Sequence, residues 1–328
     1  MRAKLAGFVC LLLVIQPAPA QGPLLPKTLT PATIHDVMAP PFTFWGNPAC
    51  DKDGNMYFHV GGSAVAEVLR LSADGSEGKI FKVAEDSPGA KGFVFQDFSV
   101  SPKGEVNILG GITGESTRIM VMHFHQDGSM DEPIYPQIPK SAFPTNVVTS
   151  DAGTVLLFGY YDDTAPRGLK KTSYLAILDS SGTPRQEVHA AVPGLDIAKL
   201  ASGETPAPAA TLGEDGNFYL PGSNEILVML PDGELVRGIP FDNPEPKSMV
   251  GRLIVSGKLI IIVLDSYINR AGHADYLVLL NPSGGVVGYY QPSEELGGWR
   301  AMCYSPQQGL IFLKVDHKRL KLLTVPLR

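Results

Sequence analysis

Cysteine and tryptophan are scarce in this chain of 328 residues, which has only 3 Cys and 2 Trp. So few cysteines exclude a small scaffold held together by many disulfides and a multi-cysteine zinc module. Charge is also sparse, because Asp, Glu, Lys and Arg make up 18% of the residues and the net charge is −6. The chain therefore lacks the basic excess that nucleic-acid binding requires.

Long apolar runs are also missing. A membrane-spanning helix needs roughly 20 apolar residues, and the longest run after the N-terminus, Leu259–Leu264, has the length of a strand. Hydrophobic residues nevertheless make up 44% of the chain, which is enough for a packed core. We therefore expect a globular protein with no transmembrane segment.

Residues 1–20 have the pattern of an export signal. Arg2 and Lys4 form a basic start, Phe8–Ile15 is a short apolar core, and Ala18-Pro19-Ala20 is a small-residue cleavage site. We expect this segment to be removed and the remaining chain to be soluble, in the periplasm or outside the cell.

Glycine and proline are abundant, with 35 and 28 residues, and glycine turns recur along the chain. Successive turns of one kind are 51 to 54 residues apart, a period typical of repeat architectures. The first turn of each unit is at Gly54, Gly104, Gly153, Gly216, Gly257 and Gly309, and the second is at Gly75, Gly128, Gly182, Gly233 and Gly284.

The runs between these turns are rich in Val, Ile, Tyr and Phe, which favour strands. Four antiparallel strands in about 50 residues, repeated six times, predict an all-β, six-bladed β-propeller. The sixth unit has no second glycine turn, so its outer strand could come from Thr33–Met38. We expect residues 21–44 to form an N-terminal segment that closes the ring, and residues 45–328 to form the propeller.

Two motifs resemble the NHL-type repeats of six-bladed propellers. They are Asp53-Gly54-Asn55-Met56-Tyr57 and Asp215-Gly216-Asn217-Phe218-Tyr219, each followed by a second Asp-Gly turn. The resemblance covers nearly the whole chain after residue 20 and implies the fold. That superfamily includes binding modules, gluconolactonases and streptogramin lyases, so the resemblance implies no single activity.

In a propeller the glycine turns share one face, and the loops between second and third strands lie on the other. Two of these loops are long, at residues 160–168 and 265–275. They are either solvated hairpin loops or the walls of a cleft, with Tyr160 and Tyr267 facing a ligand. Loops held on a rigid scaffold are where function concentrates.

Alignment of the innermost strands by their turns predicts a pocket at the channel mouth. One set of positions holds Trp45, Phe95, Pro144, Ala207, Val250 and Trp299, and the set two residues later holds Asn47, Asp97, Asn146, Ala209, Arg252 and Ala301. An aromatic rim above polar groups suits a small polar or saccharide-like ligand, and Arg300 is a further candidate contact. The alternative is that the two tryptophans fill space between the sheets.

Few residues at this mouth carry an oxygen atom that could bind a metal. Asn47, Asp97 and Asn146 suggest Ca²⁺ or another divalent cation, although a single carboxylate would bind it weakly. His123 and His125 lie on one side of a strand and form a plausible transition-metal pair. The sequence shows no third ligand for them, which favours an ordinary exposed pair.

Cys50 and Cys303 each lie late in the innermost strand of a unit, the first and the sixth. These units are neighbours in a closed ring, so the two thiols should be close in space. A disulfide needs Cα atoms within about 7 Å, and the sequence leaves open whether the bond forms.

We expect the protein to be a monomeric binding or interaction module whose partner is a small polar ligand or another envelope or extracellular protein. The alternative is a lyase or lactonase-type hydrolase that uses the same face with the help of a divalent cation. The lyases that this fold resembles imply a histidine base, for which His273 is the candidate.

Overall fold

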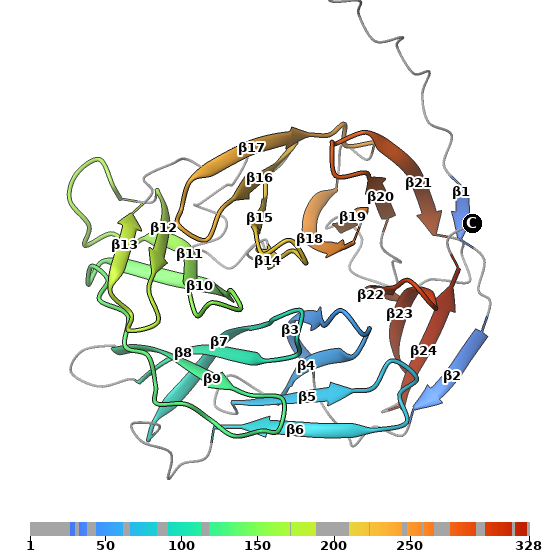
Figure 1. Cartoon of the computed structure of the whole chain (residues 1–328), viewed down its shortest axis with the longest axis horizontal. Coiled ribbons are helices and arrows are strands. Elements are labelled where there is room, and N and C mark those ends of the chain that lie inside the picture. The colour runs from blue at the N-terminus through green and yellow to red at the C-terminus, as the bar shows by residue number, and fades with distance from the viewer. Residues whose placement is uncertain are drawn as a thin grey trace, which may run out of the picture.

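The computed structural model describes residues 27–29, 33–37, 44–61, 66–83, 91–112, 118–170, 172–187, 210–222, 224–244, 248–257, 259–265, 276–292, 299–316 and 319–326. These residues contain twenty-four β-strands and no helix. The strands form six sheets, arranged as blades around a central axis (Figure 1). The predicted six-bladed propeller is confirmed.

Each blade runs outward from the axis in chain order, with antiparallel neighbours. Blade one has β3 (Phe44–Cys50), β4 (Met56–Val60), β5 (Glu67–Leu71) and β6 (Gly78–Lys82), and blade two has β7 (Phe93–Val100), β8 (Val106–Ile112) and β9 (Arg118–Phe124). Blade three has β10 (Ala142–Thr149), β11 (Val155–Tyr161), β12 (Ser173–Leu178) and β13 (Pro184–Glu187). Blade four has β14 (Thr211–Leu212), β15 (Phe218–Pro221), β16 (Glu225–Met229) and β17 (Leu235–Pro240). Blade five has β18 (Met249–Ser256), β19 (Leu259–Asp265), β20 (Tyr276–Leu280) and β21 (Val286–Pro292), and blade six has β22 (Arg300–Ser305), β23 (Gly309–Asp316) and β24 (Arg319–Val325).

The N-terminal segment closes the ring. Strand β2 (Thr33–Val37) pairs antiparallel with β24, from Thr33 opposite Thr324 to Val37 opposite Leu320. It is the outer strand that blade six lacked in the sequence, so this prediction is confirmed. Strand β1 (Lys27–Leu29) adds a parallel edge to β21 of blade five (Figure 1). The segment therefore joins two blades and covers the edge of β24.

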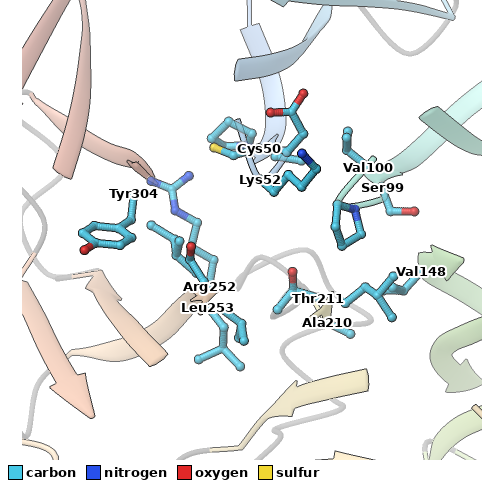
Figure 2. Close-up of a pocket in the computed structure, with 18 of the residues that line it drawn as sticks. Cys50, Lys52, Ser99, Val100, Val148, Ala210, Thr211, Arg252, Leu253 and Tyr304 are labelled. Atoms are coloured by element: carbon cyan, nitrogen blue, oxygen red, sulfur yellow. The ribbon is translucent and has the colours of Figure 1, made fainter. Parts of the chain in front are cut away.

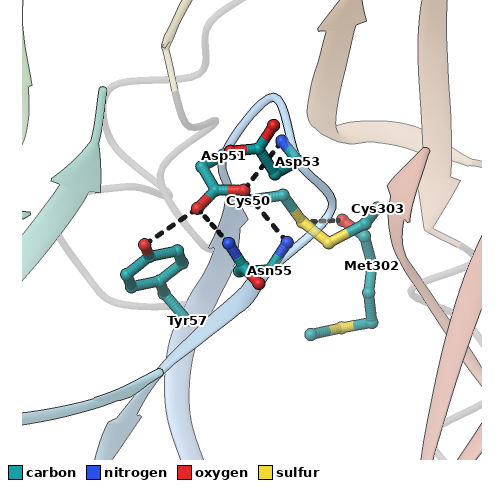
Figure 3. The surroundings of a disulfide bond; sticks show 7 residues. All are labelled: Cys50, Asp51, Asp53, Asn55, Tyr57, Met302 and Cys303. Carbon is teal, nitrogen blue, oxygen red and sulfur yellow. Dashed lines mark hydrogen bonds between the residues drawn. A yellow bond between two sulfur atoms is a disulfide. The ribbon is translucent and has the colours of Figure 1, made fainter. Parts of the chain in front are cut away.

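A disulfide between Cys50 and Cys303 closes the ring from the inside. It links β3 of blade one to β22 of blade six, with the two Cα atoms 5.8 Å apart (Figure 3). The Cys50 Sγ atom also lies 3.0 Å from the Met302 carbonyl oxygen. The predicted proximity of the two cysteines is confirmed, and the bond that the sequence left open is present.

Asp51, the residue after Cys50, holds the first glycine turn together (Figure 3). Its carboxylate accepts hydrogen bonds from the backbone N–H groups of Asp53 and Asn55, each at 3.0 Å, and from Asn55 Nδ2 at 2.7 Å and Tyr57 Oη at 3.0 Å. Burial, followed by the negative charge of Asp51, raises the pKa of the Tyr57 hydroxyl. The Asp-Gly-Asn-x-Tyr motif of blade one is therefore structural.

Every glycine predicted at a turn has a positive φ, from 55° at Gly257 to 97° at Gly233. Gly104 shows why glycine is required, because its φ is +82° and an added Cβ would lie 2.8 Å from Tyr57 Oη. In blade three, the glycine turn connects Thr149 to Val155, and Tyr161 lies at the other end of the same strand pair. The two predicted faces are therefore confirmed for this blade.

The core consists of six apolar layers, one between each pair of neighbouring blades. Adjacent side chains of a strand point to opposite faces, so Ile108 packs toward blade one and Leu109 toward blade three. Because both faces are covered, middle strands such as β8 and β12 are almost continuously buried. Each fully buried aliphatic side chain stabilises the fold by about 1.5–3 kcal/mol.

In the part of the chain that the structure describes, no helix is long and apolar enough to cross a membrane. The predicted leader, residues 1–20, lies outside the described residues.

Candidate functional site

A β-bulge interrupts the innermost strand at equivalent places in blades two, three and five. The strand pairing shifts between Phe95 and Asp97, between Pro144 and Asn146, and between Val250 and Arg252. A bulge bends a strand and redirects the side chains that follow it. Asp97, Asn146 and Arg252 therefore occupy the same position in three blades, which confirms their alignment in the sequence.

The alignment of blade six needs a correction. Its bulge falls between Ala301 and Cys303, which is nearer the turn than the bulge of blade two. Cys303 lies opposite Ile311, two residues after Gly309, whereas Asp97 lies opposite Leu109, five residues after Gly104. Ala301 lies before the bulge of its strand and is therefore not equivalent to Asp97. In blade one the pairing shifts between Trp45 and Ala49.

A narrow channel with a volume of about 80 Å³ lies on the propeller axis, between the glycine turns and the level of Asp97 and Arg252. All six blades contribute to its wall, through residues that include Cys50, Ser99, Val148, Thr211, Arg252 and Tyr304 (Figure 2). Pockets that enclose a whole small molecule usually measure roughly 300–1,000 Å³. This channel has room for a few water molecules or for one polar group of a larger ligand.

Asp97 lines the channel and has a strongly shifted pKa. Its Oδ2 accepts hydrogen bonds from Asn146 Nδ2 at 3.2 Å and from the Val147 backbone N–H at 3.1 Å. Burial raises the pKa of the carboxyl from 3.8 to about 7, although these hydrogen bonds act in the opposite direction. Near neutral pH this carboxyl is therefore partly protonated, and it can either donate or accept a proton.

Arg252 lines the same channel from blade five, and its residue is 7% exposed. Blades two and five lie opposite each other in a ring of six, so the guanidinium and the Asp97 carboxyl belong to opposite walls. The guanidinium carries five N–H donors and stays protonated. The channel thus combines a fixed cation with a carboxyl that titrates near neutral pH.

Sequence reasoning missed the charged residues at the glycine-turn end of the channel. Lys52 and Glu214 both line it, and Glu214 Oε1 accepts a hydrogen bond from Ser256 Oγ at 2.9 Å. Each lies two residues before a turn glycine, so the alignment used for the mouth would have found them. They were treated only as turn residues.

The other predicted site residues are not brought together at the mouth. Trp299 is 4% exposed and packs between blades five and six with apolar residues such as Ile261 and Leu277, which is a core position. Arg300 is exposed at the start of β22. The side chains of Trp45 and Asn47, and the whole of Tyr267, His273, Ala207 and Ala209, lie outside what the structure describes.

The loop after Tyr160 is a self-contained turn. Asp162 Oδ1 accepts hydrogen bonds from the Thr164 N–H at 2.8 Å and from Thr164 Oγ1 at 2.6 Å, and its own N–H donates to the Ser141 carbonyl. The Tyr160 ring packs against Phe143, with centroids 5.4 Å apart. These contacts favour the solvated-turn interpretation of this loop over that of a cleft wall.

The described part of the mouth does not fit a Ca²⁺ ion. Calcium needs several converging oxygen atoms, but Asn146 directs its Nδ2 donor toward Asp97. The raised pKa of Asp97 also reduces the negative charge available to a cation.

No protein-family model and no curated protein sequence matches this chain. Among solved structures, a protein of unknown function from Bacteroides caccae is 14% identical, with 77% of this chain and 82% of that one covered at a TM-score of 0.48. A gluconolactonase from Xanthomonas campestris is 12% identical, with 85% and 71% covered at a TM-score of 0.40. A PQQ-bound aldose sugar dehydrogenase from Streptomyces coelicolor is 12% identical, with 92% and 97% covered at a TM-score of 0.46. At these values the likeness carries no argument about activity, and the propeller assignment rests on the strand pairing itself.

Proposed function

We propose that this protein is an exported binding module that takes a small polar, saccharide-like ligand at the mouth of its central channel. The observation that carries the proposal is the shared position of Asp97, Asn146 and Arg252 after the bulges of three innermost strands. Polar side chains at equivalent positions around one axis can meet a single ligand from several sides.

The size of the channel determines how the ligand binds. At about 80 Å³ the channel admits only one polar group, so the body of the ligand covers the mouth. Arg252 then donates hydrogen bonds to an inserted hydroxyl or carboxylate oxygen. Asp97, on the opposite wall, orients a neighbouring hydroxyl group, and Asn146 holds the Asp97 carboxyl in place through its Nδ2.

A thermal-shift screen tests this function, because a ligand that binds only the native state raises the unfolding temperature. The panel contains neutral monosaccharides, their sugar acids and soluble oligosaccharides. We expect a concentration-dependent shift with at least one sugar or sugar acid. A panel without any shift up to millimolar concentrations contradicts the proposal.

Export is part of the proposal and has its own test. Residues 1–20 are taken as a leader, so N-terminal sequencing of the protein from the periplasm or medium should begin at Gln21. A cytoplasmic product that still begins at Met1 contradicts export, but it does not test the proposed ligand site.

A second candidate function, lactonase-type hydrolysis, is favoured by the pKa of Asp97. A carboxyl with a pKa of about 7 can accept a proton from an attacking water molecule near neutral pH. The test is hydrolysis of a sugar lactone measured against pH. Under this function the rate rises through pH 7 and Asp97→Asn abolishes it, whereas binding without turnover supports the binding module.

A further inference from the structure

A cluster of metal-ligand side chains lies on blade two, at its glycine-turn end. Glu105, His123 and His125 each place one ligand atom so that all three atoms lie within 4.8 Å of one another. Glu105 follows the turn between β7 and β8, and the histidines are two residues apart at the end of β9. The pairing of β8 with β9 therefore brings to the histidines the third ligand that the sequence did not show.

Asp131 lies beside these three residues, on the segment after the next turn. Its Oδ1 lies 3.0 Å from His125 Nε2, and its Oδ2 lies 3.8 Å from His123 Nε2. On the other side of the His125 ring, Nδ1 lies 3.6 Å from Glu105 Oε1. The two carboxylates therefore contact opposite nitrogens of His125, so Glu105 can share an ion with His125 Nδ1 while Asp131 accepts a hydrogen bond from the Nε2–H group.

His123 is already oriented as a ligand. Its Nδ1 lies 2.8 Å from Oδ1 of the buried Asn107, an oxygen that can only accept, so the ring proton is on Nδ1. The Nε2 lone pair therefore faces the cluster. Histidine ligands of metals commonly donate their second N–H to an oxygen in this way.

We propose that Glu105, His123 and His125 bind one transition-metal ion of the Zn²⁺ type, with water as the fourth ligand, while Asp131 orients His125 through its second nitrogen. Zinc takes histidine nitrogens and carboxylate oxygens in a tetrahedron at roughly 2.0–2.2 Å, which places the ligand atoms about 3.4 Å from one another. The separation of 3.6 Å between Glu105 Oε1 and His125 Nδ1 lies close to that value. Imidazole donors favour this class of metal over Mg²⁺ or Ca²⁺.

The placement of the cluster indicates a structural role for the ion. In the described residues of blade two, β9 is followed by isolated bridges from Met130 to Phe124 and from Ile134 to Val121, and not by a regular fourth strand. Asp131 belongs to that irregular segment, and its N–H donates to the His123 carbonyl at 3.0 Å. A metal ion bound to His125 would hold that imidazole in place, and with it the hydrogen bond by which Asp131 attaches this edge to β9.

The experiment uses the full chain without a histidine tag, after dialysis against a chelator. Zn²⁺ is titrated by calorimetry, and Co²⁺ is used as a spectroscopic probe because tetrahedral Co²⁺ absorbs strongly in the visible range. We expect one equivalent of each ion and the strong visible absorption. His125→Gln and Glu105→Gln, both partly exposed, should weaken binding at least tenfold, whereas Glu132→Gln at the neighbouring surface should not.

Three results would overturn the proposal: no saturable binding of one equivalent, a weak absorption typical of octahedral Co²⁺, or equal affinities in all three variants. Circular dichroism confirms that each variant is folded before titration. Asp97→Asn should leave Zn²⁺ binding unchanged, so failure of this site and failure of the channel-mouth function can be told apart.

Discussion

Asp97 and Arg252 occupy the same position, directly after the bulge, in the innermost strands of two blades that face each other across the channel. One is a carboxyl whose pKa is raised to about 7 by burial, and the other is a buried guanidinium. A repeat that places such different groups at equivalent positions creates an asymmetric channel from symmetric blades. That asymmetry is what a polar ligand would recognise.

The raised pKa of Asp97 makes stability depend on pH. The carboxyl titrates at 3.8 in the unfolded chain and at about 7 in the folded protein, so between these values only the unfolded chain is ionised. The free energy of unfolding therefore falls as pH rises from 4 to 7, by at most about 4 kcal/mol, and then stays level. Asp97→Asn removes this slope, as urea unfolding at a series of pH values will show.

The control for that series is Glu132→Gln, which removes an exposed carboxylate of blade two. Its stability profile should run parallel to that of the wild type. If the profile of Asp97→Asn is parallel as well, the Asp97 carboxyl titrates normally and the account of the channel is wrong.

Two turn glycines form a matched pair that tests the contact between blades one and two. Gly104 and Gly216 have φ values of +82° and +79°, but only Gly104 has a neighbour, Tyr57 Oη, within 3 Å of an added Cβ. Gly216→Ala should cost about 1–2 kcal/mol for the left-handed backbone alone. Gly104→Ala should cost at least about 1 kcal/mol more, because the turn would have to move away from blade one. Equal losses of unfolding free energy in the two variants, measured by chemical denaturation, would show that the contact between Gly104 and Tyr57 contributes nothing.

Removal of the disulfide should destabilise the protein. The bond joins residues 253 positions apart, and loss of a native disulfide of this kind typically costs about 2–5 kcal/mol. The double variant Cys50→Ser/Cys303→Ser should therefore unfold at a lower urea concentration. Thiol titration of the denatured, unreduced wild type should detect neither cysteine, and reaction of both would contradict the bond.

Truncation tests the closure by the N-terminal segment. A chain that begins at residue 31 loses β1 alone, whereas a chain that begins at residue 38 also loses β2 and uncovers β24. We expect the second truncation to lower stability more and to self-associate through the exposed edge, as seen by size-exclusion chromatography. Equal behaviour of the two chains would show that β2 does not hold the ring.

The architecture was predictable because its signals are local. Each turn glycine identifies a position of positive φ, and each apolar run between the turns identifies a strand, so counting them gives six units. The pairing of Thr33–Val37 with β24 followed from the one strand that the repeat lacked. The nearness of Cys50 and Cys303 followed in turn from ring closure.

The site was less predictable because it depends on partners that are distant in the sequence. A bulge exists only relative to the neighbouring strand, so the shift before Cys303 could not be counted from Gly309. Trp299 fits a rim or a core equally well until blade five is placed against it. In the same way, His123 and His125 appeared as an isolated pair, because Glu105 reaches them only through the pairing of β8 with β9.

The central claim, that a saccharide-like ligand binds through both walls of the channel mouth, is tested most directly by calorimetric titration of the strongest sugar or sugar acid from the thermal-shift panel. The variants are Asp97→Asn and Arg252→Lys on opposite walls, with Tyr160→Phe in β11, outside the channel lining, as the control. We predict a loss of affinity of at least tenfold in both channel variants and no change in Tyr160→Phe. Unchanged affinity in both channel variants would contradict the account.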